Sequence, residues 1–510
     1  MSPEGARHAA VPTSAELPQH GTGAARAERG APRPLPDLVL DLLPPGGAPA
    51  PRDVALAACR RHLARIQREV QAAFEAGEVT GLAAARWLGG LMDGLITSIH
   101  LYSLAQAGPT GRREKPVALA ATGGYGRGVL APFSDIDLLF LTEKPIGPGN
   151  RRAVEFMLYM LWDLGLKVGH ATRTISECIE DARRDISVQT ALLDARFLSG
   201  DDAAFAGFQE QFAKARAKWG LGQFLAAKRA ERAARHAKFG DSPFLVEPNI
   251  KESRGGLRDL QTLYWTARYA FGVQKMPELV GADSPGGGLL TEQEARAIKR
   301  AWNFFWTVRF QLHYVTGRAE ERLTFDLQPV VGARMGYTRH GMQEGVERFM
   351  KHLFLTTRDT VRLTRLLEPG IERAALGMPA VTRGRDPALA AQGLAIADCK
   401  VLFAPGFDIS KDPAVIFRLV IAARDRGMEI HQLAYRAMVR NARYLAQGGA
   451  ELSAPFLDVL TGKDSARWLR VLNETGVMSR FLPDWARITG LMQFDTYHVF
   501  TVEEHTIEAI

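Results

Sequence analysis

Apolar residues recur with a helical period over residues 54–107 of this 510-residue chain. Residues three or four positions apart share one face of a helix, so this pattern predicts helices, and Gly77 and Gly81 indicate a break between two of them. The preceding residues are rich in Ala, Gly, Pro and Arg and lack this period. We therefore expect a disordered tail at residues 1–50 and a helical region at residues 51–110.

From residue 115 to about residue 200, the pattern changes to strands alternating with helices. Short apolar runs predict strands at residues 117–121, 135–141 and 166–172, and a helical period predicts a helix at residues 151–164. Beyond residue 201 the pattern is almost wholly helical. The predicted fold class is therefore α+β, with a small mixed-sheet domain inside a largely helical chain.

The length of the chain exceeds what one hydrophobic core supports, so we expect about three domains. Gly, Pro and Arg breaks at residues 376–397 predict a linker or an irregular insertion. After the tail and the first helical region, the predicted boundaries are 111–200 for the mixed-sheet domain, 201–375 for a helical domain, 376–400 for the linker or insertion, 401–480 for a second helical region, and 481–510 for a C-terminal segment.

Two helical stretches carry side chains that have more than one interpretation. Trp302, Phe305, Trp306 and Phe310 are spaced as on one face of a helix, which is more typical of core than of a ligand site. The basic residues within 225–240 are more typical of a solvated helix face than of a docking patch.

The composition, with 46% apolar and 24% charged residues, is that of a soluble globular protein. The net charge of +8 is mildly basic, but without a block of five or six like charges it does not predict a surface for nucleic acid. Cys59, Cys178 and Cys399 are widely spaced, which argues against a zinc site or a disulfide framework. Because the chain also lacks an apolar run of membrane-spanning length and a signal peptide, we expect a cytoplasmic protein.

The most informative segment is 118–141, where a glycine pair lies between two predicted strands. Side chains alternate faces along a strand, so Asp135 and Asp137 project to one side while the residue between them points into the core. Mg²⁺ prefers carboxylate oxygens together with substrate phosphates. Gly123 and Gly124 lack a Cβ atom and therefore let phosphates approach the backbone closely.

Ser134 lies beside the carboxylates, where a hydroxyl can donate a hydrogen bond to a phosphate oxygen. We expect the helical run after the glycines to direct its first N–H groups at the nucleotide. The glycine spacing satisfies neither the dinucleotide fingerprint nor the P-loop motif. The segment thus predicts a site for a divalent metal and a nucleoside triphosphate; a surface strand with capping aspartates is the alternative.

Further stretches complete a resemblance to a known family. They are GLKVGHATRT (165–174), FLVEPNIKESRGGLRDLQTLYW (244–265), LHYVTGRAEERLTFDLQ (312–328) and FLPDWARITGLMQFDTYHVFTVEEHT (481–506). Segment 118–141 resembles the polymerase β-type nucleotidyltransferase superfamily. Over residues 55–510 the chain is similar to the bacterial bifunctional PII uridylyltransferase/uridylyl-removing enzymes, which sense nitrogen. The motifs at 247–261 and 493–506 are distinctive of that family.

The resemblance implies an enzyme of nitrogen regulation that moves UMP from UTP to a tyrosine of the PII signalling protein and releases pyrophosphate. Asp135 and Asp137 would be the catalytic residues and would hold two Mg²⁺ ions. Gly123, Gly124 and Ser134 would contact the phosphates of the nucleotide.

The superfamily usually adds a third carboxylate from a neighbouring strand. The predicted strand at 166–172 offers His170 instead of an acid, and Asp194 is the next candidate.

His505 falls on the position of the first metal ligand of the family's HD phosphohydrolase domain, which removes UMP from PII. The resemblance implies further ligands and glutamine-sensing ACT domains, which would fall beyond residue 510. We therefore expect this chain, as a front part of such an enzyme, to have transferase machinery without uridylyl removal or glutamine sensing. In the alternative interpretation, His498 and His505 are ordinary histidines flanking a helix.

Two clusters outside this site stay open. The first cluster has two interpretations: it forms an interhelical turn held by ion pairs, or it forms a wall of the cleft that binds the nucleotide or PII. Its members are Asn249, Lys251, Arg254, Gly255, Gly256, Arg258 and Asp259. The second cluster has the same two interpretations, and we favour a structural one, in which residues four apart on a helix form ion pairs. Its members are Arg318, Glu321, Arg322 and Asp326.

The function also has alternatives at this point. A nucleotidyltransferase with a different acceptor, as in protein adenylylation, belongs to the same class. A non-catalytic scaffold that binds PII and an enzyme that adds nucleotides to nucleic acid belong to other classes. The base preference and the oligomeric state do not follow from the sequence.

Overall fold

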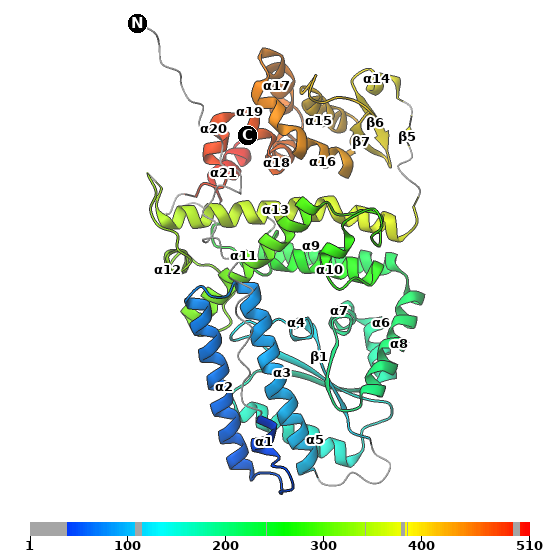
Figure 1. The fold of residues 1–510 in the computed structure, drawn as a ribbon. Helices are drawn as coiled ribbons and strands as arrows, with labels where there is room; N and C mark the ends of the chain where they lie inside the picture. Colours follow the sequence, from blue (N-terminus) through cyan, green and yellow to red (C-terminus); the bar gives the residue numbers. More distant parts are fainter. Residues whose placement is uncertain are drawn as a thin grey trace. The chain divides into compact units, whose positions relative to one another are not determined.

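A computed structural model of the chain describes residues 38–107, 115–240, 242–341, 343–378, 383–384, 386–492 and 500–510 (Figure 1). It confirms the predicted α+β class, because many helices accompany two four-stranded sheets. Within these ranges, no helix combines the length and the apolar character needed to cross a membrane.

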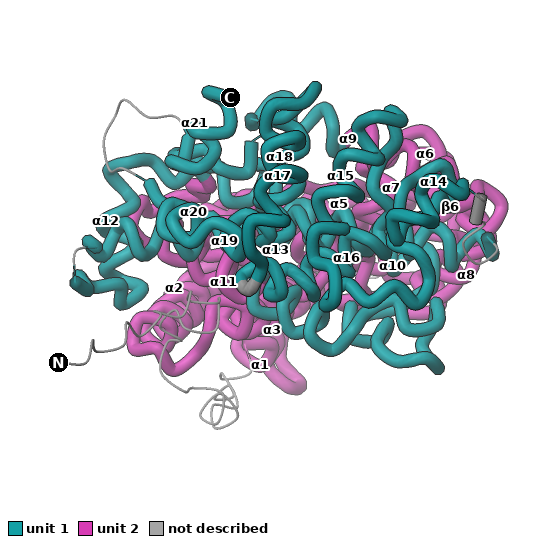
Figure 2. The backbone as a smooth tube through the Cα atoms, turned by 90° about the horizontal axis from the view of Figure 1, so that it is seen from above, with its two compact units in different colours: residues 1–21, 232–301, 322–510 teal, residues 22–231, 302–321 magenta. Residues whose placement is uncertain are grey.

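The described chain divides into two compact units (Figure 2). The nucleotide unit, as we name it here, contains residues 38–231 and 302–321, and the C-terminal unit contains residues 232–301 and 322–510. Two helices contribute residues to both units, namely α9 (Leu221–Phe239) and α11 (Glu292–Thr316). The domain boundaries proposed from the sequence stay a prediction.

The nucleotide unit contains a mixed sheet in the order β3-β2-β1-β4. Its strands are β1 (Ala118–Ala121), β2 (Ile136–Thr142), β3 (Val168–Thr174) and β4 (Arg196–Ser199). β2 pairs antiparallel with β1 and parallel with β3, and β1 pairs antiparallel with β4. Every residue of β1 and most of β2 are buried, which explains their nearly continuous apolar sequences. The three predicted strands are confirmed to within two residues, whereas β4 was not predicted.

Helices surround this sheet. They are α1 (Leu38–Leu42), α2 (Arg52–Glu75), α3 (Gly81–Gln106), α4 (Gly123–Gly126), α5 (Pro148–Asp163), α6 (Ile175–Arg184), α7 (Ile186–Leu193) and α8 (Asp202–Trp219). α2 and α3 confirm the first two predicted helices, and Gly77 between them has a φ of +72°. α8 packs against β1, β2 and β4, and α3 packs against α5 and β4.

The predicted disordered tail is wrong for its last part. Residues 1–37 lie outside the described residues, but Leu38 and Leu42 of α1 are buried. The hydroxyl of Tyr102 donates a hydrogen bond of 2.6 Å to the carbonyl of Ala50. Apolar side chains close to Pro and Gly are therefore anchored by α2 and α3, which the composition of the tail did not reveal.

The C-terminal unit is mainly helical (Figure 1). Its helices are α10 (Leu257–Phe271), α12 (Leu327–Arg334), α13 (Gly345–Ala375), α14 (Pro387–Ala390), α15 (Val415–Asp425), α16 (Gln432–Asn441), α17 (Ser453–Thr461), α18 (Ser465–Glu474), α19 (Val477–Phe481), α20 (Pro483–Ile488) and α21 (Val502–Glu508), besides short 3₁₀ turns.

This unit also contains a second sheet that the sequence analysis missed. Its strands are β5 (Arg383–Gly384), β6 (Leu394–Ala397), β7 (Lys400–Phe403) and β8 (Glu429–Ile430). The linker or insertion predicted at 376–400 and the helical region predicted at 401–480 therefore contain strands that were not predicted; residues 379–382 and 385 lie outside the described residues. Strands of two to four residues are too short to show an alternating pattern.

Three of the four residues of the aromatic stripe are core, as predicted, because Phe305, Trp306 and Phe310 are at most 1% exposed; Trp302 is only half-buried. The prediction that the basic residues within 225–240 form a solvated helix face is wrong for two residues of α9, which are buried. Lys228 pairs with Glu231 and is 3% exposed, and Arg235 pairs with Asp259.

We predict that His100 makes the nucleotide unit acid-sensitive. This histidine of α3 is 1% exposed and lies 2.7 Å from the hydroxyl of Ser199 through Nδ1. Burial lowers the pKa of His100 from 6.5 to about 4. Below pH 6.5 the unfolded chain therefore binds this proton while the folded chain does not. The free energy of unfolding should then decrease as the pH is lowered. Between pH 6.5 and 5 we expect a loss of about 2 kcal/mol.

Denaturant unfolding at pH 7, 6 and 5 measures this loss. Because other histidines titrate in the same range, the comparison is with His100→Gln, which lacks the group. Equal pH slopes for both proteins would contradict the prediction.

Candidate active site

The predicted acidic pair lies at the start of β2. After β1 the chain makes the single turn α4 and a loop, and the N–H of Thr122 donates a hydrogen bond of 3.0 Å to the carbonyl of Asp137. Ile136 is 3% exposed, Asp137 is partly exposed and Asp135 is exposed. The alternation predicted for these residues is therefore present. The apolar side chain lies in the core, and the carboxylates on either side of it lie outside the core.

The carboxylate of Asp137 lies between two glycines. A Cβ atom on Gly123 would lie 2.8 Å from Oδ2 of Asp137, and one on Gly169 would lie 2.6 Å from Oδ1. Gly169 is the direct partner of Asp137 in the parallel pairing of β3 with β2. Gly123 also has a φ of +55°, which favours glycine. Only residues without a side chain leave this space for the carboxylate, and the sequence analysis identified Gly123 but missed Gly169.

The glycine pair does not precede a long helix. Gly123 and Gly124 are the first residues of α4, which is four residues long. One turn has too few aligned peptides for an appreciable helix dipole, and the expectation that its first N–H groups face the nucleotide stays a prediction. Arg196 of β4 holds this turn through hydrogen bonds of 3.3 Å to the carbonyls of Tyr125 and Gly126.

Asp194 is not placed as a third metal carboxylate. Its side chain is fully buried and forms an ion pair of 2.6 Å with Arg127. His170 is exposed and pairs in register with Leu138 rather than with Asp137, and its ring lies 6.2 Å from that of Trp162. Neither residue adds a carboxylate beside the acidic pair.

Ser134 is already oriented. Nη2 of Arg309 on α11 donates a hydrogen bond of 3.1 Å to Oγ of Ser134. A hydroxyl that accepts this bond keeps its own proton as a donor. Ser134 is thus prepared to donate to an anionic oxygen, which suits its predicted contact with a phosphate.

His505 lies apart from these residues in the sequence and belongs to the C-terminal unit. It is exposed on α21, whereas its neighbours Glu503 and Glu504 are buried. Across the described ranges, no three His, Cys, Asp or Glu side chains gather as a metal site. The role of His505 as a ligand stays a prediction, and His498 lies outside the described residues.

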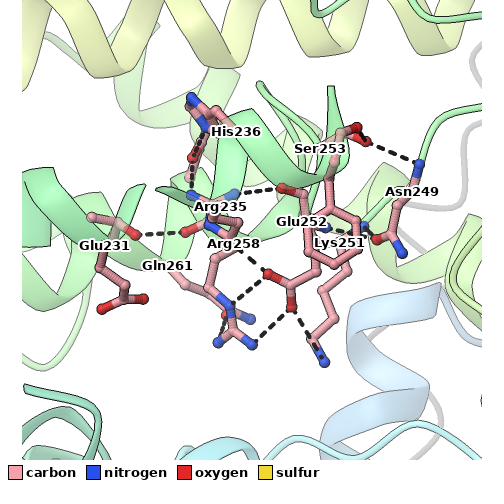
Figure 3. A network of polar contacts seen from close by, with 12 residues as sticks. Glu231, Arg235, His236, Asn249, Lys251, Glu252, Ser253, Arg258 and Gln261 are labelled. Atoms are coloured by element: carbon pink, nitrogen blue, oxygen red, sulfur yellow. Dashed lines mark hydrogen bonds and ion pairs between the residues drawn. The ribbon is translucent and has the colours of Figure 1, made fainter. Parts of the chain in front are cut away.

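The polar cluster between α9 and α10 contains a network of hydrogen bonds and ion pairs among its own residues (Figure 3). Oδ1 of Asn249 accepts hydrogen bonds from the N–H groups of Lys251 and Glu252, at 3.1 and 2.8 Å. Glu252 pairs with Arg258 at 3.1 Å, and its carbonyl accepts a bond from Arg235 at 2.6 Å. These contacts favour the structural interpretation, an interhelical turn with ion pairs.

Asp259 lies at the centre of this network and is 2% exposed. It accepts hydrogen bonds from Arg235, from His236 at 3.1 Å and from the N–H of Gly255 at 2.7 Å. Burial alone would raise the pKa of Asp259, but the bonds from His236 and Arg235 hold this pKa below its usual range. The acid is therefore charged and occupied by its own neighbours.

The second open cluster is not on a helix. Its residues lie between α11 and α12, where Glu321 pairs with Arg309 and Arg322 pairs with Glu247 at 3.1 Å. The ion pairs are present, but the predicted partners four residues apart are wrong, because helix α11 ends at Thr316.

Comparison with known proteins agrees with this geometry. The family described as nucleotidyltransferase domain matches residues 110–193, and the family described as GlnD PII-uridylyltransferase matches residues 223–367. Over about nine tenths of its length, the chain is similar to uridylyltransferase/uridylyl-removing enzymes. The first match thus covers the acidic pair and both glycines that flank Asp137.

Three relatives are named bifunctional uridylyltransferase/uridylyl-removing enzyme. The protein of Gluconobacter oxydans is 43% identical over 90% of this chain and 50% of its own length. The corresponding values are 40%, 90% and 50% for Azospirillum brasilense, and 42%, 87% and 47% for Rhodospirillum rubrum. The chain thus spans about half the length of these family members.

We predict that Gly169→Ala weakens divalent metal binding without unfolding the protein. The new Cβ meets only the end of the Asp137 side chain, so the carboxylate turns while the strand keeps its place. We expect at least about tenfold weaker Mn²⁺ binding, measured by electron paramagnetic resonance. Gly90→Ala is the control, because Gly90 is exposed on α3 with nothing within 4 Å of its Cβ position. Unchanged Mn²⁺ affinity in Gly169→Ala would count against the site.

Asp194→Asn, in contrast to Gly169→Ala, is expected to lower stability and to leave Mn²⁺ binding nearly unchanged. Breaking its buried pair with Arg127 should lower the free energy of unfolding by about 3 kcal/mol. Mn²⁺ affinity should stay within about twofold, as Asp194 does not act as a ligand. The exposed pair Arg52–Asp163 gives the control: Asp163→Asn should cost less than about 1 kcal/mol. A loss of Mn²⁺ binding in Asp194→Asn would restore Asp194 as the third carboxylate.

Proposed function

We propose that this chain transfers UMP from UTP to a tyrosine hydroxyl of the PII signalling protein, with Mg²⁺ as cofactor. The observation that carries the proposal is the Asp137 carboxylate between Gly123 and Gly169, with Asp135 two positions away, in a matched nucleotidyltransferase domain. The names of the relatives supply the transferred group, and the family description supplies PII.

The residues present fit Mg²⁺. Asp135 and Asp137 offer carboxylate oxygens, and those of Asp137 are not crowded by a Cβ atom because Gly123 and Gly169 lack one. Bound Mg²⁺ neutralises the triphosphate and lowers the pKa of an attacking hydroxyl. A site with two protein carboxylates and substrate phosphates is a usual arrangement for this ion.

The other residues bind and orient the nucleotide. The backbone of Gly123 lies beside Asp137, and Gly123 and Gly124, which lack a Cβ atom, give the phosphates close access. The hydroxyl of Ser134 donates to a phosphate oxygen. In the reaction, the tyrosine oxygen forms a bond to the α-phosphorus, the bond from that phosphorus to the bridging oxygen breaks, and pyrophosphate leaves. Placing these groups accounts for much of the expected acceleration.

A direct labelling experiment tests the substrates. The protein is incubated with Mg²⁺, purified PII and either UTP or ATP carrying a labelled α-phosphate. We expect label on PII from UTP and not from ATP. Label from ATP alone would point to protein adenylylation, and label on RNA without label on PII would point to an enzyme that extends nucleic acid.

Asp135→Asn and Asp137→Asn should each reduce transfer more than about a hundredfold, because each removes a ligand itself rather than a residue around it. Binding of PII should persist, which separates catalysis from a scaffold function. Glu143→Gln is the control: Glu143 lies just after β2, is 54% exposed and, among the described residues, pairs with Lys115 at 3.9 Å. Full transfer by both Asp variants would refute a catalytic role for the pair.

A further inference from the structure

We propose that Arg309, His313 and Glu321 position the loop segment Phe133–Asp135, and so set the geometry in which Asp135 meets metal and nucleotide. This inference rests on the proposed function of the acidic pair. The three residues are positioning residues, since they act through the loop. All of them, with the loop, belong to the nucleotide unit.

Arg309 connects the loop to an acid. Its Nη2 donates to Oγ of Ser134 at 3.1 Å, and its Nε donates to Oε1 of Glu321 at 2.8 Å. Its guanidinium also lies 5.0 Å from the ring of Trp306, one helical turn earlier. A guanidinium held by an acid and an aromatic ring has little freedom to move, so the position of Ser134 is fixed with it.

His313 connects the same acid to the preceding residue of the loop. Its Nδ1 faces the N–H of Phe133 at 3.4 Å, and its Nε2 lies 3.6 Å from Oε1 of Glu321. Because Nδ1 accepts from a backbone N–H, the proton of the neutral ring lies on Nε2, toward the acid. The contacts therefore close a ring: Ser134, Arg309, Glu321, His313 and Phe133.

The burial of this ring argues for a role beyond folding. The side chains of Arg309, Glu321 and His313 are 10%, 15% and 0% exposed. Apolar side chains of similar volume would hold a loop here without the cost of removing charges from water. Hydrogen bonds of fixed direction instead specify where Phe133 and Ser134 lie, and Asp135 follows directly.

The preceding part of the loop has a separate support. The N–H of Leu130 donates to the carbonyl of Ala85 on α3 at 3.0 Å, and the N–H of Ser134 donates to the carbonyl of Ala131 at 3.1 Å. Loss of the ring should therefore loosen residues 133–135 and leave the fold in place. A displacement of about 1 Å at a reacting site is enough to cost about a hundredfold in rate.

The test uses two variants that weaken the ring at different points. His313→Leu removes the acceptor for the Phe133 N–H, and Glu321→Gln removes the charge but keeps the shape. For both we expect kcat for UMP transfer to fall about tenfold or more, while KM for UTP stays within about threefold. Amide exchange at Phe133, measured by mass spectrometry, should become faster.

His313→Asn should restore kcat to within about threefold of the wild type, since its Oδ1 can replace Nδ1 as acceptor. Asp181→Asn is the control, because it breaks a 2.7 Å pair with Arg173 between α6 and β3, in the same unit but away from the loop. A merely structural role would lower the melting temperature and leave kcat per folded molecule unchanged. That result, or unchanged amide exchange at Phe133 in both ring variants, would overturn the inference; if His313→Leu does not fold, Glu321→Gln decides.

Failure of the proposed function gives a different result. If the wild type transfers no UMP to PII, the substrate assignment fails, and Mn²⁺ affinity together with amide exchange still measures the loop. Weaker Mn²⁺ binding and faster exchange in both ring variants would then support the positioning role. Wild-type values for both would overturn it.

Discussion

The space around one carboxylate constrains the whole nucleotide unit. Oxygens of Asp137 lie within 2.8 Å of the positions that Cβ atoms of Gly123 and Gly169 would take, so three segments of the chain must meet without side chains between them. The parallel pairing of β2 and β3 brings Gly169 opposite Asp137, and such pairing requires a crossover, which α5 supplies. The turn after β1 brings Gly123 to the other side. The topology of the sheet therefore determines which residues lie beside the Asp137 carboxylate, and so how accessible this carboxylate is.

Arginines fix the frame around this space. Arg127, the residue that follows α4, pairs with Asp194. Arg196 pairs with Asp93 at 2.7 Å and also donates hydrogen bonds to carbonyls of α4. Arg309 connects Glu321 to the loop before β2. Partly or wholly buried pairs of this kind contribute little net stability compared with apolar packing. Their benefit is direction, because a planar guanidinium with several donors orients each group that it contacts.

Part of this arrangement follows from the sequence. Strand alternation correctly placed Asp135 and Asp137 around the buried Ile136, and the apolar run after them predicted a buried strand. The role of Gly169 did not follow, because it depends on which residue of β3 lies beside Asp137, and the register of two strands is set by the folded sheet. The ion pair of Asp194 did not follow for a similar reason, since its partner Arg127 is 67 positions away in the sequence. A glycine inside a strand was the available signal for close approach.

In one of the two motifs identified as distinctive of the family, residues 247–261, the polar side chains mostly bond to each other and to α9. Asn249 caps the turn that follows it, and Asp259 is buried against Arg235 and His236. Substitutions there would disturb the fold first, so selection can preserve the motif for architecture alone. A distant descendant that has lost its chemistry would still carry this fingerprint. Surveys of genomes that rely on it will count such proteins as active enzymes unless they also inspect the glycines that flank Asp137.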